Sequence, residues 1–141
     1  MKKQISILII AILLFSIIVP AYAEELEPPI DNPVIEEFQG MRSVTASLEI
    51  SGSTATCHSK LTGKSSYSYC LTMSLQKQNG SSWSTVVSWS ETGAGINGIN
   101  LTKVKSGLSS GIYRCKVSVS VYDSNNQQVE STTAYSTSLS C

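Results

Sequence analysis

Histidine is almost absent from this chain: His58 is the only one among 141 residues. A serine-type catalytic triad needs a histidine beside the nucleophile, and no Gly-x-Ser-x-Gly motif offers such a serine. Cys57 precedes His58, but neighbouring residues of a strand point to opposite faces of a sheet, so this pair is unsuited to act as nucleophile and base. The sequence therefore argues against nucleophilic catalysis.

Acidic residues are scarce after residue 42, where only four occur. Hydrolysis of a glycosidic bond needs two carboxyl groups about 5 to 10 Å apart in one cleft. The four lie beside predicted turns or at polar strand positions, where a solvated carboxylate is the usual state: Glu49, Glu91, Asp123 and Glu130. We therefore predict that the protein is not an enzyme.

The sequence also lacks a Cys-x-x-Cys pair and a basic tract. A structural zinc site would have to be built from widely separated cysteines. The run Asp123-Ser124-Asn125 lacks the glycine and the terminal glutamate of a calcium loop. Ten Lys and Arg residues balance ten Asp and Glu residues, so no large surplus of positive charge favours nucleic acid. We predict no metal, no cofactor and no nucleic-acid partner.

A long hydrophobic run occurs only near the N-terminus. Lys2-Lys3 precede the apolar stretch 5–19, and Ala21-Tyr22-Ala23 has the small-x-small pattern that a signal peptidase needs. A membrane-spanning helix needs about 20 apolar residues, so an uncleaved anchor is the weaker alternative. We predict a signal peptide over residues 1–23, cleavage after Ala23, and an extracellular protein that is secreted or stays at the cell surface without a stable membrane anchor.

Proline is confined to the N-terminal part of the chain. Three of the four prolines, Pro28, Pro29 and Pro33, lie in segment 24–42 together with six acidic residues. Proline among like charges favours an extended, solvated chain. We therefore predict an acidic linker over residues 24–42 and a single domain over residues 43–141.

From Val44 onward, apolar residues recur at every second position, as in Val44, Ala46, Leu48 and Ile50. This period places alternate side chains on opposite faces of a sheet. Turn signals such as Asn79-Gly80 separate the alternating segments. Strands are expected around residues 44–50, 55–61, 69–75, 83–89, 99–104, 113–121 and 129–139. The pattern predicts an all-β, antiparallel sandwich of about seven strands.

The arrangement of Cys57 with Tyr113-Arg114-Cys115 resembles the immunoglobulin-like sandwich. In that fold a cysteine of the second strand pairs across the core with one of the sixth, and the tyrosine two residues earlier forms a tyrosine corner. The resemblance therefore implies a Cys57–Cys115 disulfide. It departs from the immunoglobulin pattern at the third strand, where Met73 occupies the region of the expected tryptophan.

Residues 44–141 are also similar to a family of small exported proteins of Gram-positive bacteria that has no assigned function. The similar segments are Thr54–Cys57, Thr72–Lys77, Ser82–Val86, Tyr113–Val117 and Tyr135–Thr137. This resemblance implies an exported β-sandwich and no particular activity.

An even number of cysteines in an exported chain predicts two disulfides, and four cysteines allow three pairings. Cys57 and Cys115 fall on apolar faces near the starts of their strands, which favours their pairing and leaves Cys70 and Cys141 by elimination. A Cys57–Cys141 bond is the main rival, and Cys70 could instead bond to a second molecule.

Aromatic residues offer the clearest candidates for binding. Trp83 and Trp89 have the same parity, so one face of a strand is expected to carry both. Trp89 is favoured for the core, whereas Trp83 could either pack in the core or be exposed. Tyr67 and Tyr122 occupy polar positions. Aromatic surface can stack on a sugar ring or anchor a protein. We therefore predict that Trp83, Tyr67 and Tyr122 bind a partner.

The favoured function is a non-catalytic binding module, with a cell-wall glycan or a protein as its partner. The alternative is a structural or self-associating envelope protein whose sheets meet edge to edge or whose cysteine bridges two copies. A small secreted hydrolase or toxin is the third and weakest hypothesis.

Overall fold

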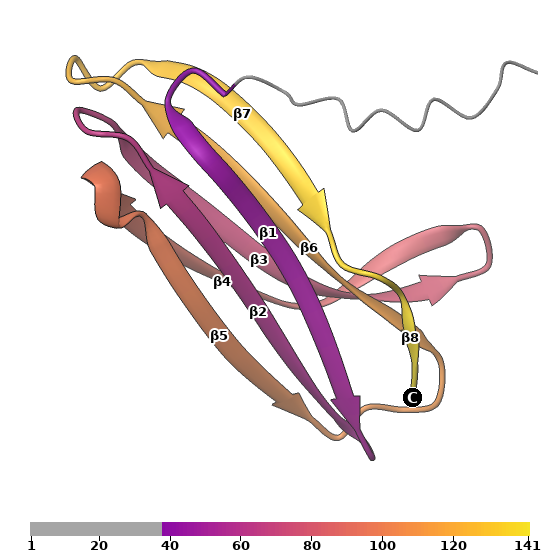
Figure 1. Cartoon of the computed structure of the whole chain (residues 1–141). Helices are drawn as coiled ribbons and strands as arrows, with labels where there is room; N and C mark the ends of the chain where they lie inside the picture. The colour runs from indigo at the N-terminus through magenta and orange to yellow at the C-terminus, as the bar shows by residue number, and fades with distance from the viewer. Residues whose placement is uncertain (1–37) are drawn as a thin grey trace, which may run out of the picture. The chain divides into compact units, whose positions relative to one another are not determined.

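The computed structural model describes residues 38–141 (Figure 1), so the predicted signal peptide and most of the predicted linker lie outside the described residues. Within that range, no helix is long and apolar enough to cross a membrane. The domain has eight strands and one short 3-10 helix, η2 (Gly95–Asn97). The strands are β1 (Met41–Ser51), β2 (Thr54–Gly63), β3 (Ser68–Asn79), β4 (Ser82–Ala94), β5 (Ile99–Ser106), β6 (Ile112–Tyr122), β7 (Gln128–Tyr135) and β8 (Leu139–Ser140).

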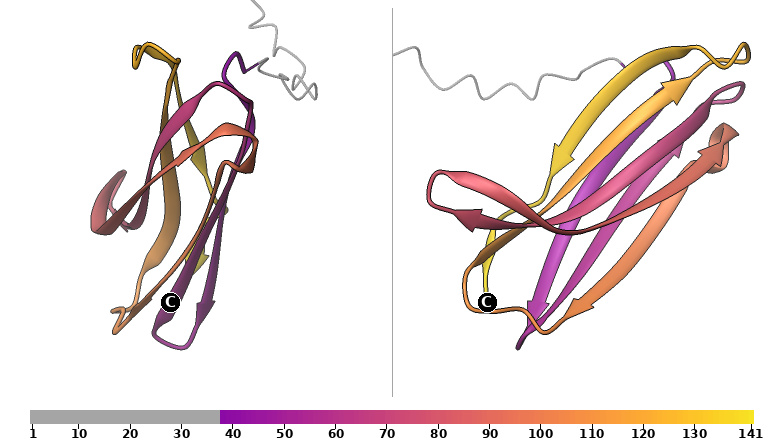
Figure 2. Two further views of the ribbon diagram at one scale, coloured as in Figure 1. Left: turned by 90° about the vertical axis from the view of Figure 1, so that its left-hand side faces the viewer. Right: turned by 180° about the vertical axis from the view of Figure 1, so that it is seen from behind.

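The strands form two antiparallel sheets that pack face to face (Figure 2). The smaller sheet has the order β1-β2-β5, and the larger has the order β4-β3-β6-β7 with β8 pairing to β6. The predicted all-β, antiparallel fold is confirmed, and six of the seven expected strands occur where the alternation placed them. The seventh is divided into β7 and β8.

The division of the last strand follows from one serine. Ser136 donates its backbone N–H to the Cys115 carbonyl at 2.9 Å, while its hydroxyl accepts the Cys115 backbone N–H at 2.8 Å. The Cys115 N–H therefore bonds to the Ser136 hydroxyl, whereas in a continuing strand it would bond to a backbone carbonyl of that strand. A side-chain hydrogen bond of this kind offers the backbone an alternative to the sheet ladder.

Alternate residues of the strands fill the space between the two sheets. On β6, the side chains of Tyr113, Cys115, Val117, Val119 and Val121 are at most 1% exposed. Burying one valine side chain contributes on the order of 2 kcal/mol to folding. The Tyr113 hydroxyl donates a hydrogen bond to the Ser109 carbonyl at 2.7 Å, a bond back to the backbone a few residues upstream.

The domain begins before the predicted boundary at residue 43. Met41 is fully buried at the start of β1. Gly40 donates its N–H to the Glu130 carboxylate and accepts a hydrogen bond from the Tyr69 hydroxyl, both at 2.9 Å. The Lys64 ammonium group donates to the Phe38 carbonyl. These contacts correct the prediction, because they attach residues 38–42 to the sandwich.

Candidate binding surface

The larger sheet has one face turned away from the core, which we call the outer face. Directly paired residues of neighbouring strands point to the same side of a sheet. The pairing of β3, β4, β6 and β7 therefore identifies the side chains that lie on the outer face. Eleven of them are serine or threonine: Ser68, Thr72, Ser74, Thr85, Ser88, Ser90, Thr92, Ser118, Ser120, Ser131 and Thr133. Neighbouring hydroxyls bond across strands, with Thr72 at 2.9 Å from Ser90 and Ser74 at 2.7 Å from Ser88. The outer face is therefore a hydroxyl-rich sheet surface.

A bulge in β4 decides which tryptophan reaches this face. Leu75 of β3 pairs with Val87, but the next residue of β3 pairs with Thr85, so Val86 is an extra residue without a partner. One extra residue reverses the alternation beyond it. Trp89 pairs with the buried Met73 and packs against the core, whereas Trp83 lies on the outer face. The prediction that one face carries both tryptophans is wrong, and the core position favoured for Trp89 is confirmed.

Trp83 and Tyr135 hold an arginine between them. The central guanidinium carbon of Arg114 lies 4.2 Å from the centre of the Trp83 ring and 4.3 Å from the centre of the Tyr135 ring. The Arg114 Nε–H donates to the Gln76 side-chain oxygen at 2.9 Å. We call Trp83, Arg114 and Tyr135 the aromatic–arginine stack.

Each member of the stack is placed by its strand. Arg114 pairs with Gln76 on the β3 side of β6, and Tyr135 at the end of β7 pairs with Lys116 on the other side. Trp83 comes from β4, beyond β3, where the β3–β4 hairpin extends past the neighbouring strands (Figure 1). The rings thus approach the guanidinium from strands on opposite sides of β6. Cation–π contacts at a partly exposed site contribute about 0.5–1 kcal/mol each.

Arg114 and Tyr135 were missed by the interpretation of the sequence. Period two does place Arg114 opposite the face of Tyr113 and Cys115, so its outward direction could be predicted. Its two aromatic neighbours could not, because they depend on which strands flank β6 and on the bulge in β4. Tyr135 is 50% exposed, which leaves part of the stack open to a partner.

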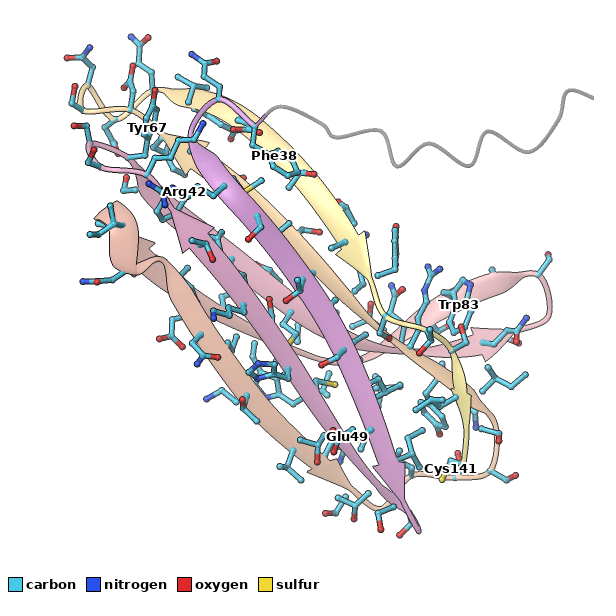
Figure 3. All side chains as sticks on the ribbon, in the orientation of Figure 1. Phe38, Arg42, Glu49, Tyr67, Trp83 and Cys141 are labelled. Carbon is cyan, nitrogen blue, oxygen red and sulfur yellow. The ribbon has the colours of Figure 1, made fainter. Side chains whose placement is uncertain are left out.

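The other two predicted binding residues lie at the far end of the sheet from Trp83 (Figure 3). Tyr122 pairs with Ser68, while Trp83 pairs with Gln78, ten positions along β3. At about 3.3 Å per residue, the separation is roughly 30 Å. Tyr67 lies in the turn before β3, beside Ser68. The structure therefore does not bring Trp83, Tyr67 and Tyr122 into one site.

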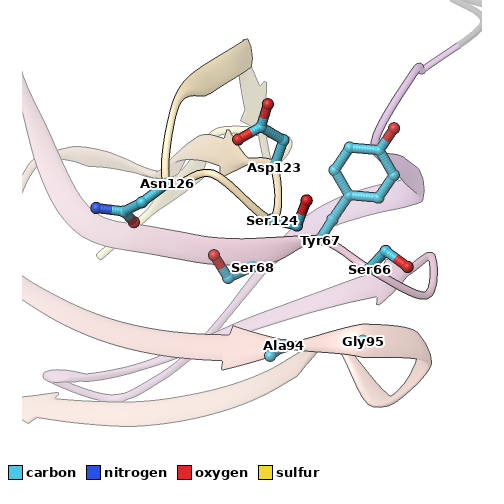
Figure 4. A pocket seen from close by; sticks show the side chains of 8 residues that line it. All are labelled: Ser66, Tyr67, Ser68, Ala94, Gly95, Asp123, Ser124 and Asn126. Carbon is cyan, nitrogen blue, oxygen red and sulfur yellow. The ribbon is translucent and has the colours of Figure 1, made fainter.

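Tyr67 lines an open depression of ≈ 420 Å³ between the β2–β3 turn, η2 and the β6–β7 hairpin (Figure 4). The Asp123 carboxylate at its rim accepts the backbone N–H groups of Asn125 and Gln127, each at 2.9 Å. These bonds satisfy the carboxylate within its own hairpin turn, as aspartate commonly does in turns. The depression offers hydrogen-bonding groups but no strong chemical feature.

The cysteines divide into a buried pair and two separated ones. Cys57 of β2 and Cys115 of β6 are both fully buried, and their side chains lie close together across the core. The nearby Cys57 thiol, together with burial, raises the pKa of the Cys115 thiol far above its ordinary value. Full burial keeps both sulfurs away from solvent and from any substrate, so the pair is suited to a structural role.

Cys70 and Cys141 lie too far apart for the pairing assigned by elimination. Cys70 pairs with Ser120 of β6, whereas Cys141 follows Ser140, which pairs with Ile112 at the other end of β6. Bridged cysteines have Cα atoms within about 7 Å, and eight strand positions span roughly 26 Å. The predicted Cys70–Cys141 bond within one chain is therefore corrected. The Cys141 thiol instead donates to the Gly52 carbonyl at 3.4 Å.

The titratable side chains considered for catalysis lie on different elements. The ring nitrogen Nδ1 of His58 is 2.6 Å from the Thr102 hydroxyl on the smaller sheet, while Cys57 points into the core, which confirms their predicted opposite directions. Glu49 is on β1, Glu91 on β4 and Glu130 on β7. Among residues 38–141, no three or more His, Cys, Asp or Glu side chains could together hold a metal ion.

A double-mutant cycle tests the stack. Because Trp83 and Arg114 attract each other directly, Trp83→Ala and Arg114→Met should show a coupling energy of about 0.5–1 kcal/mol in urea unfolding. Trp89→Phe with Arg114→Met is the control, since these residues lie on opposite faces of the sheet and their effects should add. Additive effects for Trp83 and Arg114 would contradict the stack.

No family model and no curated protein matches the sequence. The solution structure of CsgH from R. palustris aligns with a TM-score of 0.37 and 14% identity, covering 66% of this chain and 90% of that one. A similarity of this size supports no statement about function, and the resemblance to a Gram-positive family stays a prediction.

Proposed function

We propose that this protein is an exported, non-catalytic module that binds a polysaccharide through the outer face of its larger sheet. The observation that carries the proposal is the aromatic–arginine stack at one end of a face with eleven serine and threonine side chains. Aromatic rings stack on sugar rings, and hydroxyl groups both donate and accept hydrogen bonds, as sugar hydroxyls do. The face thus offers both kinds of contact that a sugar chain can use.

A polysaccharide fits this face better than a folded protein does. Tryptophan, tyrosine and arginine also anchor protein interfaces, but serine and threonine are under-represented among the residues that dominate protein binding. The interior of a protein interface is depleted of polar groups that cannot be paired. Large apolar side chains are few beside the stack, with Val86 at 41% and Ile112 at 44% exposed.

The absence of acid–base groups from this face supports a role without catalysis. No position that the strand register places on the outer face is an Asp, Glu or His. Glycoside hydrolysis through two carboxyl groups would require them beside the bound sugar. Binding is therefore the function that this face supports best.

We further propose that the domain is an immunoglobulin-like sandwich with a Cys57–Cys115 disulfide. The two thiols face each other on the second and sixth strands, and the Tyr113 corner has the expected hydrogen bond. Closing this loop would contribute about 4 kcal/mol by chain entropy. Peptide mapping without reduction should recover the peptides of Cys57 and Cys115 linked to each other; Cys57 linked to Cys141 would refute the pairing.

Retention on insoluble polysaccharide tests the proposed function. Trp83→Ala should weaken binding of the purified protein to the polysaccharide by about five- to thirtyfold, because a stacking aromatic contributes on the order of 1–2 kcal/mol. Tyr67→Ala is the matched control, since Tyr67 lies at the opposite end of the sheet and should bind like the wild type. Thermal unfolding must be similar in all three proteins. Equal retention of wild type and Trp83→Ala would contradict the proposal.

A second candidate function, self-association, is favoured by the exposed edge of β4. This edge strand has 13 residues and contains no proline and no lysine; Glu91 is its one charged residue. An unprotected edge presents free backbone groups to which another strand can add. By contrast, the edge strand β5 carries Lys103 and Lys105, whose register turns them toward the core side, a common protection against strand addition.

Introducing two lysines on β4 tests whether copies of the protein self-associate through this strand. If copies pair through β4, the wild type should form oligomers that grow with concentration in sedimentation velocity. The double variant Ser84→Lys/Val86→Lys should stay monomeric, because antiparallel pairing would bring like charges together. A wild type that remains monomeric at every concentration would contradict self-association.

A further inference from the structure

The part of the Arg114 side chain that remains available to a partner is the edge of the guanidinium formed by its two Nη groups. Rings from strands on opposite sides of β6 lie 4.2 and 4.3 Å from its guanidinium carbon, and its Nε–H is bound to Gln76, which is only 8% exposed. Covalent geometry places the two Nη groups at the end of the side chain farthest from the backbone. Their N–H groups form the edge that matches a carboxylate or phosphate with two parallel hydrogen bonds.

The stack also fixes this edge before any partner arrives. An arginine in solution samples many rotamers, and ordering one on binding costs about 0.5–1.5 kcal/mol. The rings of Trp83 and Tyr135 and the amide of Gln76 already restrict the Arg114 side chain. A ligand that uses the Nη edge therefore avoids most of this cost.

The outer face leaves the positive charge of Arg114 without an opposite charge. No position that register places on this face is an Asp or Glu, and Lys116 adds a second cation two residues along β6. Residues 38–141 as a whole contain eight Lys and Arg residues and four Asp and Glu residues. Charge complementarity therefore favours an anionic partner, and an excess of one sign steers such partners toward the surface.

We infer that the polysaccharide of the proposed function is acidic and that Arg114 binds the carboxylate of a uronic acid through its Nη edge; this inference rests on the proposed function. A carboxylate is planar, so it continues the plane of the guanidinium between the two flanking rings. A tetrahedral phosphate fits this arrangement less well, because some of its oxygens project out of that plane. The sugar ring that bears the carboxylate then lies beside Trp83 or Tyr135.

The matched ligands for the test are polygalacturonate and its methyl ester, which differ only in the charge of the carboxyl groups. The wild type should bind polygalacturonate at least about tenfold more tightly than the ester, because a charge-assisted, bidentate pair is worth about 1.5–3 kcal/mol. Arg114→Lys keeps the charge but loses the planar fork, so it should lose this preference. Lys116→Gln, on the same face, should keep it.

Each other result has a definite meaning. Equal binding of polygalacturonate and its ester by the wild type would overturn the inference and leave the proposed function standing. An equal loss in Arg114→Lys and Lys116→Gln would also overturn it, because it would indicate general charge attraction without a specific Arg114 contact. If the wild type bound a polyglycerol phosphate more tightly than polygalacturonate, Arg114 would prefer a phosphate to a carboxylate, which would contradict the inference. Failure to bind polygalacturonate would also overturn the inference, while the retention experiment with Trp83→Ala decides the proposed function separately.

Discussion

Alternation of side chains between the two faces of each strand is the constraint on which this domain depends. One set of residues, such as Tyr113, Cys115 and Val117 on β6, enters the space between the sheets and is almost fully buried. The other set is directed to the outside by the same backbone geometry. The residues needed for stability and those available for binding are therefore separated along every strand.

The alternation is interrupted at Val86, and the candidate site depends on that interruption. Without the extra residue, Trp83 would point to the same side as Trp89, toward the core. With it, Trp83 reaches the outer face and lies against the Arg114 guanidinium, which is also in contact with the Tyr135 ring from the other side of β6. Bulges often redirect side chains near functional sites. Because the members of the stack are placed by paired strands and not by loops, the surface is ordered in advance of binding.

The sequence was informative where structure depends on local pattern. Period two and the turn residues located the strands, and the direction of Arg114 and the burial of Trp89 follow from the same rule. Features that depend on distant parts of the chain could not be predicted. Ser136 ends β7 by bonding to Cys115, the hydroxyl of Tyr69 attaches Gly40 to the domain, and the order of strands separates Cys70 from Cys141. The distance of Tyr67 and Tyr122 from Trp83 also depends on the strand register, which the sequence does not show.

The central claim is that the outer face of the larger sheet is the binding surface. Its most direct test is a titration of the isotope-labelled protein with oligogalacturonate, followed by backbone and indole N–H signals in nuclear magnetic resonance spectra. We expect shifts at the Trp83 indole, at Arg114 and at Tyr135, with unchanged signals from His58 and Thr102 on the smaller sheet. Shifts confined to the smaller sheet or to the depression at Tyr67 would contradict the claim.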